Sequence, residues 1–389
     1  MPIILLAFLW FTEPVFGEIR VSGYTKSTLL MNEIESNPLL EFSRSYESQN
    51  NFRLMVDGFG SNLSWQIHYE ISPVFTSRSS LSQTFQAQEA TYRAYDLDQT
   101  ISAKSRKNKT FQNLDRLNLQ FQFEKSDLTL GRQSIDLGSA RMISPTDIFV
   151  PFNLQTLNTE YRIGIDAIRY QRQFSELSGI DAGIILGDEA QSDNSAAFIK
   201  LQANLKGTDY KFTVVEYAKQ SLYSFGAESS LRELGFWLEV AYVRGDEDYE
   251  LASSGADFSL NEKIFLQLEY HFNGAGSDDP SAYQEQARKI PYRKGGVTLL
   301  GEHYLLPSVS IQVSPFFNMV AGGVFNLSDN SSFVSLVGEW SISENFYIDV
   351  GWYHFSGKDF SAEPTEALAL GSEYGLNSDL LYTSFKFYF

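Results

Sequence analysis

The chain of 389 residues contains no cysteine, so it forms no disulfide and carries no thiol nucleophile. It also lacks any run near the roughly 18–20 consecutive apolar residues that a membrane-spanning helix needs. Helical membrane proteins are therefore excluded. Positive charge is scarce: 30 Lys and Arg face 48 Asp and Glu, which gives a formal net charge of -18. Without a basic stripe to neutralise phosphates, we predict no nucleic-acid partner.

Sequence patterns for catalysis or cofactor binding are also lacking. The four histidines, His68, His271, His303 and His354, are dispersed and form no HExxH or paired metal motif. No glycine-rich phosphate loop precedes a helix. We therefore predict no cofactor, no metal and no catalytic residue. One enzymatic alternative stays open, a barrel-type lipid hydrolase, which needs a serine and a histidine on adjacent lipid-facing strands; His68 and His271 instead fall among the polar positions.

What the chain does have is a repeated alternation of apolar and polar residues. In residues 63–72, LSWQIHYEIS, every second side chain is apolar or aromatic. This period of two predicts a β-strand with one apolar and one wet face. We predict an all-β fold of about eighteen such strands, at 19–30, 52–57, 63–72, 116–123, 127–133, 164–173, 179–188, 196–205, 209–218, 221–229, 233–244, 250–260, 263–273, 299–314, 316–327, 332–342, 345–356 and 379–389.

The connections between these strands predict how the sheet is arranged. Short links alternate with links that include long ones at 31–50, 76–112, 134–163, 274–298 and 357–378. A sheet this large, with no helix to cover its apolar face, is expected to close into a transmembrane antiparallel barrel. Short turns would then be periplasmic and long loops extracellular. The count of eighteen requires 299–314 to be one strand despite Pro307, so sixteen strands remains an alternative.

The last ten residues, LLYTSFKFYF, predict the strand that closes the barrel. Phe385, Phe387 and Phe389 lie on one side of it. Here the chain resembles the outer-membrane β-barrels of Gram-negative bacteria, whose terminal strand ends in Phe. The resemblance implies an outer-membrane location, contact with outer-membrane lipid and recognition by the barrel-assembly machinery. A basic loop tip at 104–109 could contact lipopolysaccharide, although a solvated charge run is the simpler interpretation.

Residues 1–17, MPIILLAFLWFTEPVFG, are typical of a signal peptide that is too short to span as an anchor. They lack the usual positive start, so we expect the translation start to lie upstream or the sequence to be trimmed. The alternative is a buried first strand. Residues 18–389 are then expected to form a single barrel domain.

The stretch from Leu128 to Arg172 combines Gly-Arg-Gln at a strand end, a Gly/Arg/Pro/Asp loop and a returning strand that bears Asp. Here the chain resembles porins of the alginate-export type. The resemblance implies that loop 134–163 folds inward and narrows a pore. Opposed charges at such a constriction would select polar solutes. The charges could equally pin the loop to the wall. The expected constriction residues are Arg132, Asp136, Arg141, Asp147, Asp166, Arg169 and Arg172.

The polar phase of the strands predicts the residues that line the lumen. They include Arg20, Lys26, Arg53, Asp57, His68, Glu70, Arg116 and Glu269. Counted with Lys200, Lys211, Lys386, Asp181, Glu239, Glu339 and Asp349, which share this phase, the wall carries seven bases and seven acids, so no ion preference follows. We predict a water-filled porin for passive diffusion of ions and small polar solutes; the alternative is a specialised saccharide or polysaccharide channel, although this lumen is less basic than those of the resembled exporters. Monomer and trimer both remain open.

Overall fold

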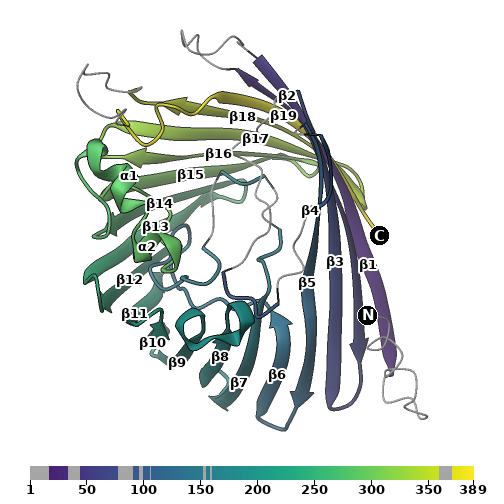
Figure 1. Cartoon of the computed structure of the whole chain (residues 1–389), viewed down its shortest axis with the longest axis vertical. Coiled ribbons are helices and arrows are strands. Elements are labelled where there is room, and N and C mark those ends of the chain that lie inside the picture. Colours follow the sequence, from purple (N-terminus) through teal and green to yellow (C-terminus); the bar gives the residue numbers. More distant parts are fainter. Residues whose placement is uncertain are drawn as a thin grey trace.

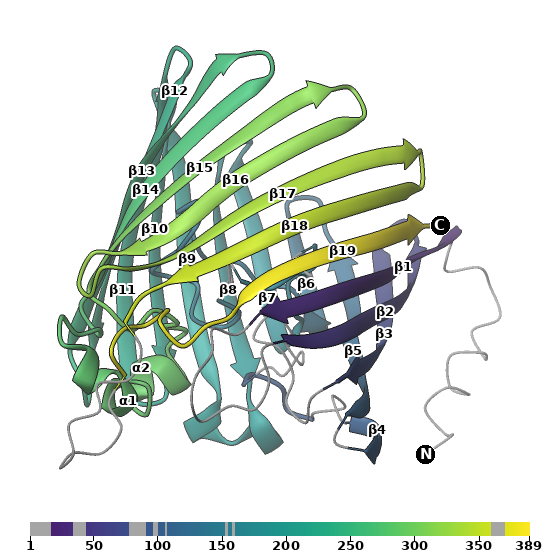
Figure 2. The ribbon, with the colours of Figure 1, turned by 90° about the horizontal axis from the view of Figure 1, so that it is seen from above.

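The computed structural model describes residues 17–33, 44–77, 91–95, 100–105, 107–151, 155–157, 160–358 and 370–389. These residues form one antiparallel sheet of nineteen strands that closes on itself (Figures 1 and 2). The strands are β1 (Glu18–Glu33), β2 (Arg44–Phe59), β3 (Leu63–Thr76), β4 (Thr100–Ser105), β5 (Asn108–Gln122), β6 (Ser126–Gln133), β7 (Ile165–Ser175), β8 (Ser178–Leu186), β9 (Ala196–Leu205), β10 (Thr208–Tyr217), β11 (Gln220–Leu231), β12 (Leu234–Arg244), β13 (Tyr249–Asn261), β14 (Ile264–Asn273), β15 (His303–Ser314), β16 (Phe317–Asn326), β17 (Ser331–Ser343), β18 (Phe346–Ser356) and β19 (Asp379–Tyr388).

Strand pairing confirms the predicted barrel and its eighteen wall strands. β1 pairs with both β2 and β19, so the first and last strands lie side by side, with Thr25 opposite Phe387 and Ser27 opposite Phe385. β3 pairs directly with β5, so the short β4 adds to the sheet beside β5 without being a nineteenth wall strand. The predicted basic tip at 104–109 lies at the β4–β5 connection, with residue 106 outside the described part.

Strand β15 settles the choice between eighteen and sixteen strands. It runs unbroken from His303 to Ser314, and Pro307 pairs with Leu268 of β14. On the other side of β15, the pairing with β16 skips from Leu305 to Ser308. Proline has no N–H to donate, and a local gap in one ladder accommodates it without ending the strand.

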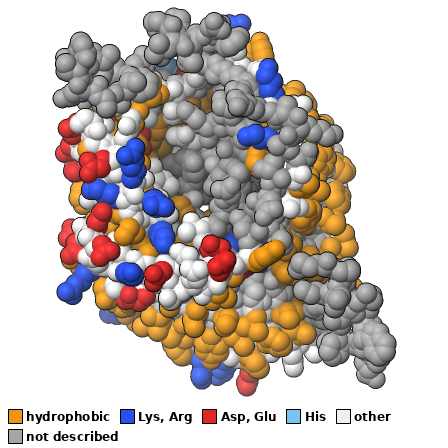
Figure 3. All heavy atoms as spheres, viewed as in Figure 1, with side chains coloured by type: hydrophobic (Ala, Val, Ile, Leu, Met, Phe, Trp, Pro, Cys, Tyr) orange, Lys and Arg blue, Asp and Glu red, His pale blue; other side chains and the backbone are white. Residues whose placement is uncertain are grey.

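The two faces of the wall differ as a barrel in lipid requires. Leu54, Phe212 and Leu268 are about half exposed on the outer face, whereas Arg53 and Glu269 are buried on the inner face. Figure 3 shows hydrophobic side chains gathered over the outside of the wall. Every backbone group of a closed sheet can pair within the sheet, which is what hydrocarbon demands. Within the described residues, no helix has the length and apolar character needed to cross a membrane.

The two ends of the barrel carry different connections. At one end, here the turn end, all links are short: 60–62, 123–125, 176–177, 206–207, 232–233, 262–263, 315–316 and 344–345. At the other, the loop end, the links include the long segments 77–107, 134–164, 274–302 and 357–378. Short helices lie in two of the loop-end links: η2 (Asp188–Ala190), η3 (Ser192–Asn194), η4 (Pro280–Ala282), α1 (Tyr283–Gln286) and α2 (Ile290–Arg293). Phe389 lies at the turn end, where its backbone pairs with Gly23. The predicted signal peptide, 1–17, lies outside the described residues except for Gly17.

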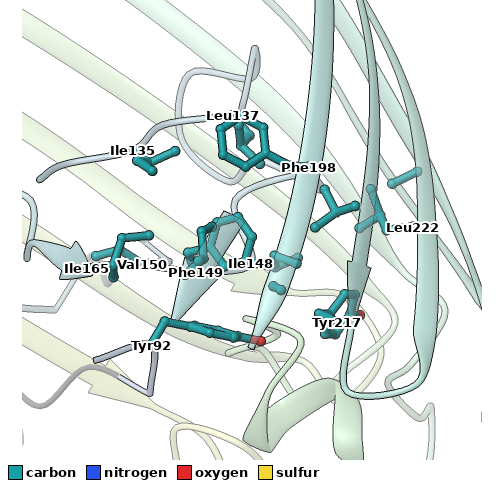
Figure 4. Packing of buried hydrophobic residues seen from close by; sticks show 14 of the residues in the cluster. Tyr92, Ile135, Leu137, Ile148, Phe149, Val150, Ile165, Phe198, Tyr217 and Leu222 are labelled. Atoms are coloured by element: carbon teal, nitrogen blue, oxygen red, sulfur yellow. The ribbon is translucent and has the colours of Figure 1, made fainter. Parts of the chain in front are cut away.

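An apolar cluster fills part of the barrel interior toward the loop end (Figure 4). Its members come from the inner faces of β7–β13, from residue 92 and from the link after β6. Ile148 and Phe149 of that link pack among them, and the Tyr92 ring meets the Phe149 ring edge-on at 5.0 Å. Burying these side chains inside the barrel holds the link within the lumen.

Candidate pore constriction

The described residues of the link between β6 and β7, which are 134–151, 155–157 and 160–164, lie in the lumen and contact two sides of the wall. Its first arm, 134–151, meets β12. There the Glu239 carboxylate accepts five hydrogen bonds from the arm: from the backbone N–H of Ser139 and Ala140 at 2.6 Å, from Thr146 N–H at 2.9 Å, from the Ser144 hydroxyl at 2.8 Å and from the Thr146 hydroxyl.

A second carboxylate holds residues 141–143 of the same arm, which lie between the residues that bind Glu239. Glu269 of β14 accepts N–H bonds from Arg141 and Met142 at 3.1 Å and from Ile143 at 2.8 Å. Its fourth donor is the indole N–H of Trp237, at 2.8 Å. Glu239 and Glu269 are 1% and 0% exposed. Buried carboxylates are stable only with such a full set of donors, so this arm is fixed to the wall through its main chain.

The second arm, residues 160–164, is attached across the lumen to β1, β2 and β19. Lys26 forms an ion pair of 2.7 Å with Glu160, which also accepts a hydrogen bond from Tyr388. Tyr161 stacks on Tyr24 with 5.8 Å between ring centroids, and the Arg53 guanidinium lies 4.3 Å from the Tyr161 ring. This attachment is therefore made by side chains.

The two arms are also joined to each other. Arg162 contacts the Asp147 carboxylate and lies 3.5 Å from Asp136. Burial raises the pKa of Asp147 to about 7, against the opposing effect of Arg162, which favours the carboxylate. One Asp147 oxygen is buried without a hydrogen-bond partner in the described structure. The described residues of the link, called here the bar, are thus attached to both walls, and their two arms are joined to each other.

Arginines converge on one carboxylate beside the second arm. Asp115 of β5 contacts Arg53 and lies 2.8 Å from Arg116. The same carboxylate accepts the Gly164 N–H at 2.8 Å, while Arg93, from the link before β4, donates to the Gly164 carbonyl at 2.8 Å. Arg53 also lies 3.9 Å from the buried Glu70 carboxylate, so the three arginines on this side of the lumen face two buried anions.

The predicted constriction residues do not form a single group. Arg132 and Asp166 pair at 2.8 Å where β6 and β7 meet the link. Arg132 also donates to the Tyr95 carbonyl at 2.7 Å, so segment 91–95 covers it. Arg169 pairs with Asp181 of β8 at 2.6 Å. Arg169 also donates to the carbonyl of Ser134, the first residue of the link, at 3.4 Å. These charges therefore join neighbouring wall strands and hold the start of the link against them.

Arg141 and Arg172 lie elsewhere. The Arg141 side chain is half exposed inside the lumen, 3.8 Å from both Glu228 and Asp257 and 5.4 Å from the Trp237 ring. Arg172 contradicts the prediction. It is exposed, and it lies near the turn end of β7 in phase with outward-facing Tyr170. A returning strand carries its later residues away from the loop, which the grouping by sequence ignored.

Most of the predicted lumen residues lie on the inner face. Lys26, Arg53, His68, Glu70, Arg116 and Glu269 are buried there, and Asp57 lies 2.9 Å from the His68 ring. Arg20 differs: it is exposed at the turn-end mouth, 3.6 Å from Glu18. Buried pairs within the wall, rather than free charges, account for most of this set.

A cavity of about 310 Å3 lies between the first arm and segment 295–299 of the link before β15. Charged groups of both signs line it: Arg141 and Arg162, Asp147 and Glu160. The remaining lining is largely apolar and includes Met142 and Leu299. A polar solute crossing the lumen on this side would meet both guanidinium and carboxylate groups.

The sequence analysis did not assign four residues that shape the bar: Asp115, Glu160, Tyr161 and Arg162. Glu239 stands on the polar phase of its strand, where alternation predicts a residue that faces the lumen. Glu160, Tyr161 and Arg162 sit in a link without periodicity, where alternation carries no information.

No protein-family model matches the chain, and no curated protein matches it in sequence. Solved structures do match it over nearly its full length. OccAB4 of Acinetobacter baumannii superimposes with a TM-score of 0.61 at 9% identity, covering 96% of this chain and 99% of that one. OccK9 (OpdG) of Pseudomonas aeruginosa gives 0.58 at 10%, covering 97% and 99%. A BenF-like porin from Pseudomonas fluorescens gives 0.57 at 8%, covering 96% and 99%.

The chain has the fold of these barrels. At such low identity the likeness extends to the fold alone. The resemblance to alginate-export porins rests on the residues around 128–172 alone.

Proposed function

We propose that this chain is an outer-membrane porin that lets ions and small polar solutes diffuse through its lumen. The observation that carries the proposal is a closed barrel, apolar outside and polar inside, crossed by one internal bar at 134–164. Such a wall suits hydrocarbon on one side and water on the other. The fold shared with a BenF-like porin supports the same function.

The proposal includes an orientation. The turn end, where β1 begins and β19 ends, faces the periplasm, and the loop end faces the exterior. Residues 1–17 act as the signal peptide, 18–389 form the one barrel domain, and the strand ending at Phe389 is recognised by the assembly machinery. The bar sets the size limit, and the charges around Arg141 and Arg162 act on passing solutes.

Liposome swelling tests this proposal. Vesicles that contain the folded protein should swell in small sugars and amino acids at rates that fall with solute size. Vesicles made with the heat-unfolded protein are the control. Swelling at the control rate for every solute, including the smallest, would show that the lumen is sealed and would refute the porin.

A specialised saccharide channel is the second candidate, because basic and aromatic side chains lie together on one wall. Arg53, Arg116, Tyr24 and Tyr161 gather on the β1–β5 side, and the alginate-export resemblance suggests the same function. Their pairing with Asp115 weakens the case for a free polyanion track. Block of the channel current by acidic or neutral oligosaccharides at micromolar concentration would support this candidate.

The geometry does not favour the lipid-hydrolase alternative. Ser253 lies 2.8 Å from the His271 ring, but its hydroxyl donates to the Ile143 carbonyl at 2.6 Å. Both side chains are buried on the inner face, away from lipid. We infer that this pair supports the first arm of the bar.

A further inference from the structure

Three metal-ligand side chains meet at the loop end, outside the lumen site. Asp278 belongs to the link between β14 and β15, Glu302 ends that link, and His303 begins β15. One ligand atom from each lies within 4.8 Å of the other two. We propose that Asp278, Glu302 and His303 bind a divalent transition-metal ion such as Zn2+.

The backbone fixes the two carboxylates side by side. The Ser277 N–H donates to the Leu300 carbonyl at 3.0 Å, and the Asn273 N–H donates to the Glu302 carbonyl at 2.8 Å. The chain that leads to Asp278 is therefore held against the chain that leads into His303. The group does not depend on a chance approach of two long side chains.

The imidazole distinguishes this group from an ordinary acidic surface. The Tyr270 hydroxyl bonds His303 Nδ1 at 2.8 Å, and the Phe272 ring lies 5.4 Å from the imidazole. A ring held through Nδ1 presents Nε2, which is how protein partners usually orient a metal-binding histidine. The tyrosine is therefore a positioning residue for the ligand.

Charge at the group favours a cation. Asp278 and His303 are the charged groups next to Glu302. Among the described side chains, no Lys or Arg forms an ion pair with either carboxylate. Two facing carboxylates without a basic partner repel each other, and a bound dication removes that repulsion.

The donor set indicates the class of ion. One imidazole nitrogen with two carboxylates suits Zn2+ and similar ions better than Mg2+ or Ca2+, which prefer all-oxygen shells. Ligand atoms around a tetrahedral Zn2+ lie about 3.3 Å apart, given bonds of about 2.0 Å. Small rotations of three partly exposed side chains would bring atoms within 4.8 Å to that spacing. The fourth position remains open to water.

Zn2+ titration by calorimetry tests the site on the folded, detergent-solubilised chain carrying no added histidines. We expect one Zn2+ per chain, and at least a tenfold weaker affinity in Glu302→Gln and in His303→Gln. His354→Gln is the matched control, because His354 lies 2.8 Å from Asp379 at the same end and has no place in the three-residue group. Absence of stoichiometric binding, or unchanged binding in His303→Gln, would overturn the proposal.

A second measurement uses the wild type alone and so does not depend on variant folding. Diethyl pyrocarbonate should modify His303 slowly with Zn2+ present and at least several-fold faster after chelation, as read by peptide mass spectrometry. Modification of His354 should not change. Equal modification of His303 in both states would also overturn the site, whether or not the barrel conducts.

Discussion

On the β12–β14 side of the lumen, wall carboxylates accept main-chain N–H groups of the bar, whereas on the β1–β2 side the bar and the wall meet through side chains. Glu239 and Glu269 serve the first attachment. Lys26 and Arg53 serve the second, through Glu160 and Tyr161. The first attachment fixes the path of the chain mainly through its backbone, with the Ser144 and Thr146 hydroxyls in addition, while the second specifies which side chains must stand there.

Releasing the main-chain attachment should have the largest effect. In the double variant Glu239→Gln/Glu269→Gln, the amides cannot accept all the donors that now converge on the carboxylates. Each lost charge-assisted bond costs about 1.5–3 kcal/mol, so we expect the first arm to leave the wall. Single-channel conductance should rise by about twofold or more as the lumen widens.

Glu250→Gln is the matched control for that variant, because Glu250 is an exposed carboxylate at the loop end of β13. It should conduct as the wild type does. A folded double variant with wild-type conductance would show that the carboxylates do not hold the constriction.

Releasing the side-chain attachment should have a smaller effect. Glu160→Gln/Tyr161→Ala removes the ion pair and the ring contacts. The second arm keeps the Gly164 N–H bond to Asp115 at 2.8 Å and the Arg116 bond to the Arg162 carbonyl at 2.8 Å. We expect a conductance increase below that of Glu239→Gln/Glu269→Gln, measured in the same bilayers. A larger conductance increase in Glu160→Gln/Tyr161→Ala than in Glu239→Gln/Glu269→Gln would contradict the view that the main-chain attachment is the stronger one.

The ion selectivity of the channel should depend on charged side chains that are exposed in the lumen and not on those buried in ion pairs. Arg141→Gln removes a half-exposed guanidinium from the lumen, so reversal potentials in asymmetric KCl should move toward cation preference, by about twofold in the permeability ratio. Arg132→Gln removes a buried charge that is paired with Asp166 and covered by Tyr95. The Arg132→Gln variant should have a lower free energy of unfolding and an unchanged reversal potential. An equal shift in both variants would contradict this reading.

The smallest expected effect concerns pH at the loop end. Glu373 accepts hydrogen bonds from the Leu300 N–H at 3.0 Å and the Tyr304 hydroxyl at 2.6 Å, and burial raises its pKa from 4.5 to about 7. The folded state therefore holds a proton that the unfolded state releases. The stability gained from that proton is complete below pH 4.5 and is lost as the pH rises through about 7.

Hydrogen exchange of residues 370–378 at pH 5 and pH 8 measures this effect. Exchange should be better protected at pH 5, after correction for intrinsic rates. In Glu373→Gln, which cannot ionise, the pH dependence should vanish. Protection that increases toward pH 8 in the wild type would have the wrong sign.

The sequence was sufficient for the barrel wall, because strand alternation is a local property that survives folding. Pro307 was the one doubtful join, and a gap in the β15–β16 pairing resolves it. The constriction was harder to predict. Arg172 follows Asp166 by six residues, but at about 3.3 Å per residue a strand carries it roughly 20 Å toward the other end.

Contacts of the bar could not be predicted for a different reason. Glu269 was recognised as a lumen residue, but its partners in the bar are backbone N–H groups, which every residue except proline carries and which leave no trace in the sequence. Tyr161 and Arg162 meet the wall only after the link has crossed the lumen. Charged residues in a link thus identify a region rich in contacts without identifying which contacts form.

Single-channel recording with neutral polymers of graded size tests the central claim most directly. If the bar at 134–164 narrows an open lumen, the wild type should give discrete conductance steps that small polymers reduce and larger ones do not. Glu239→Gln/Glu269→Gln should admit larger polymers than the wild type. A folded wild-type protein that gives no steps at any voltage, or an identical polymer cut-off in both proteins, would contradict the account.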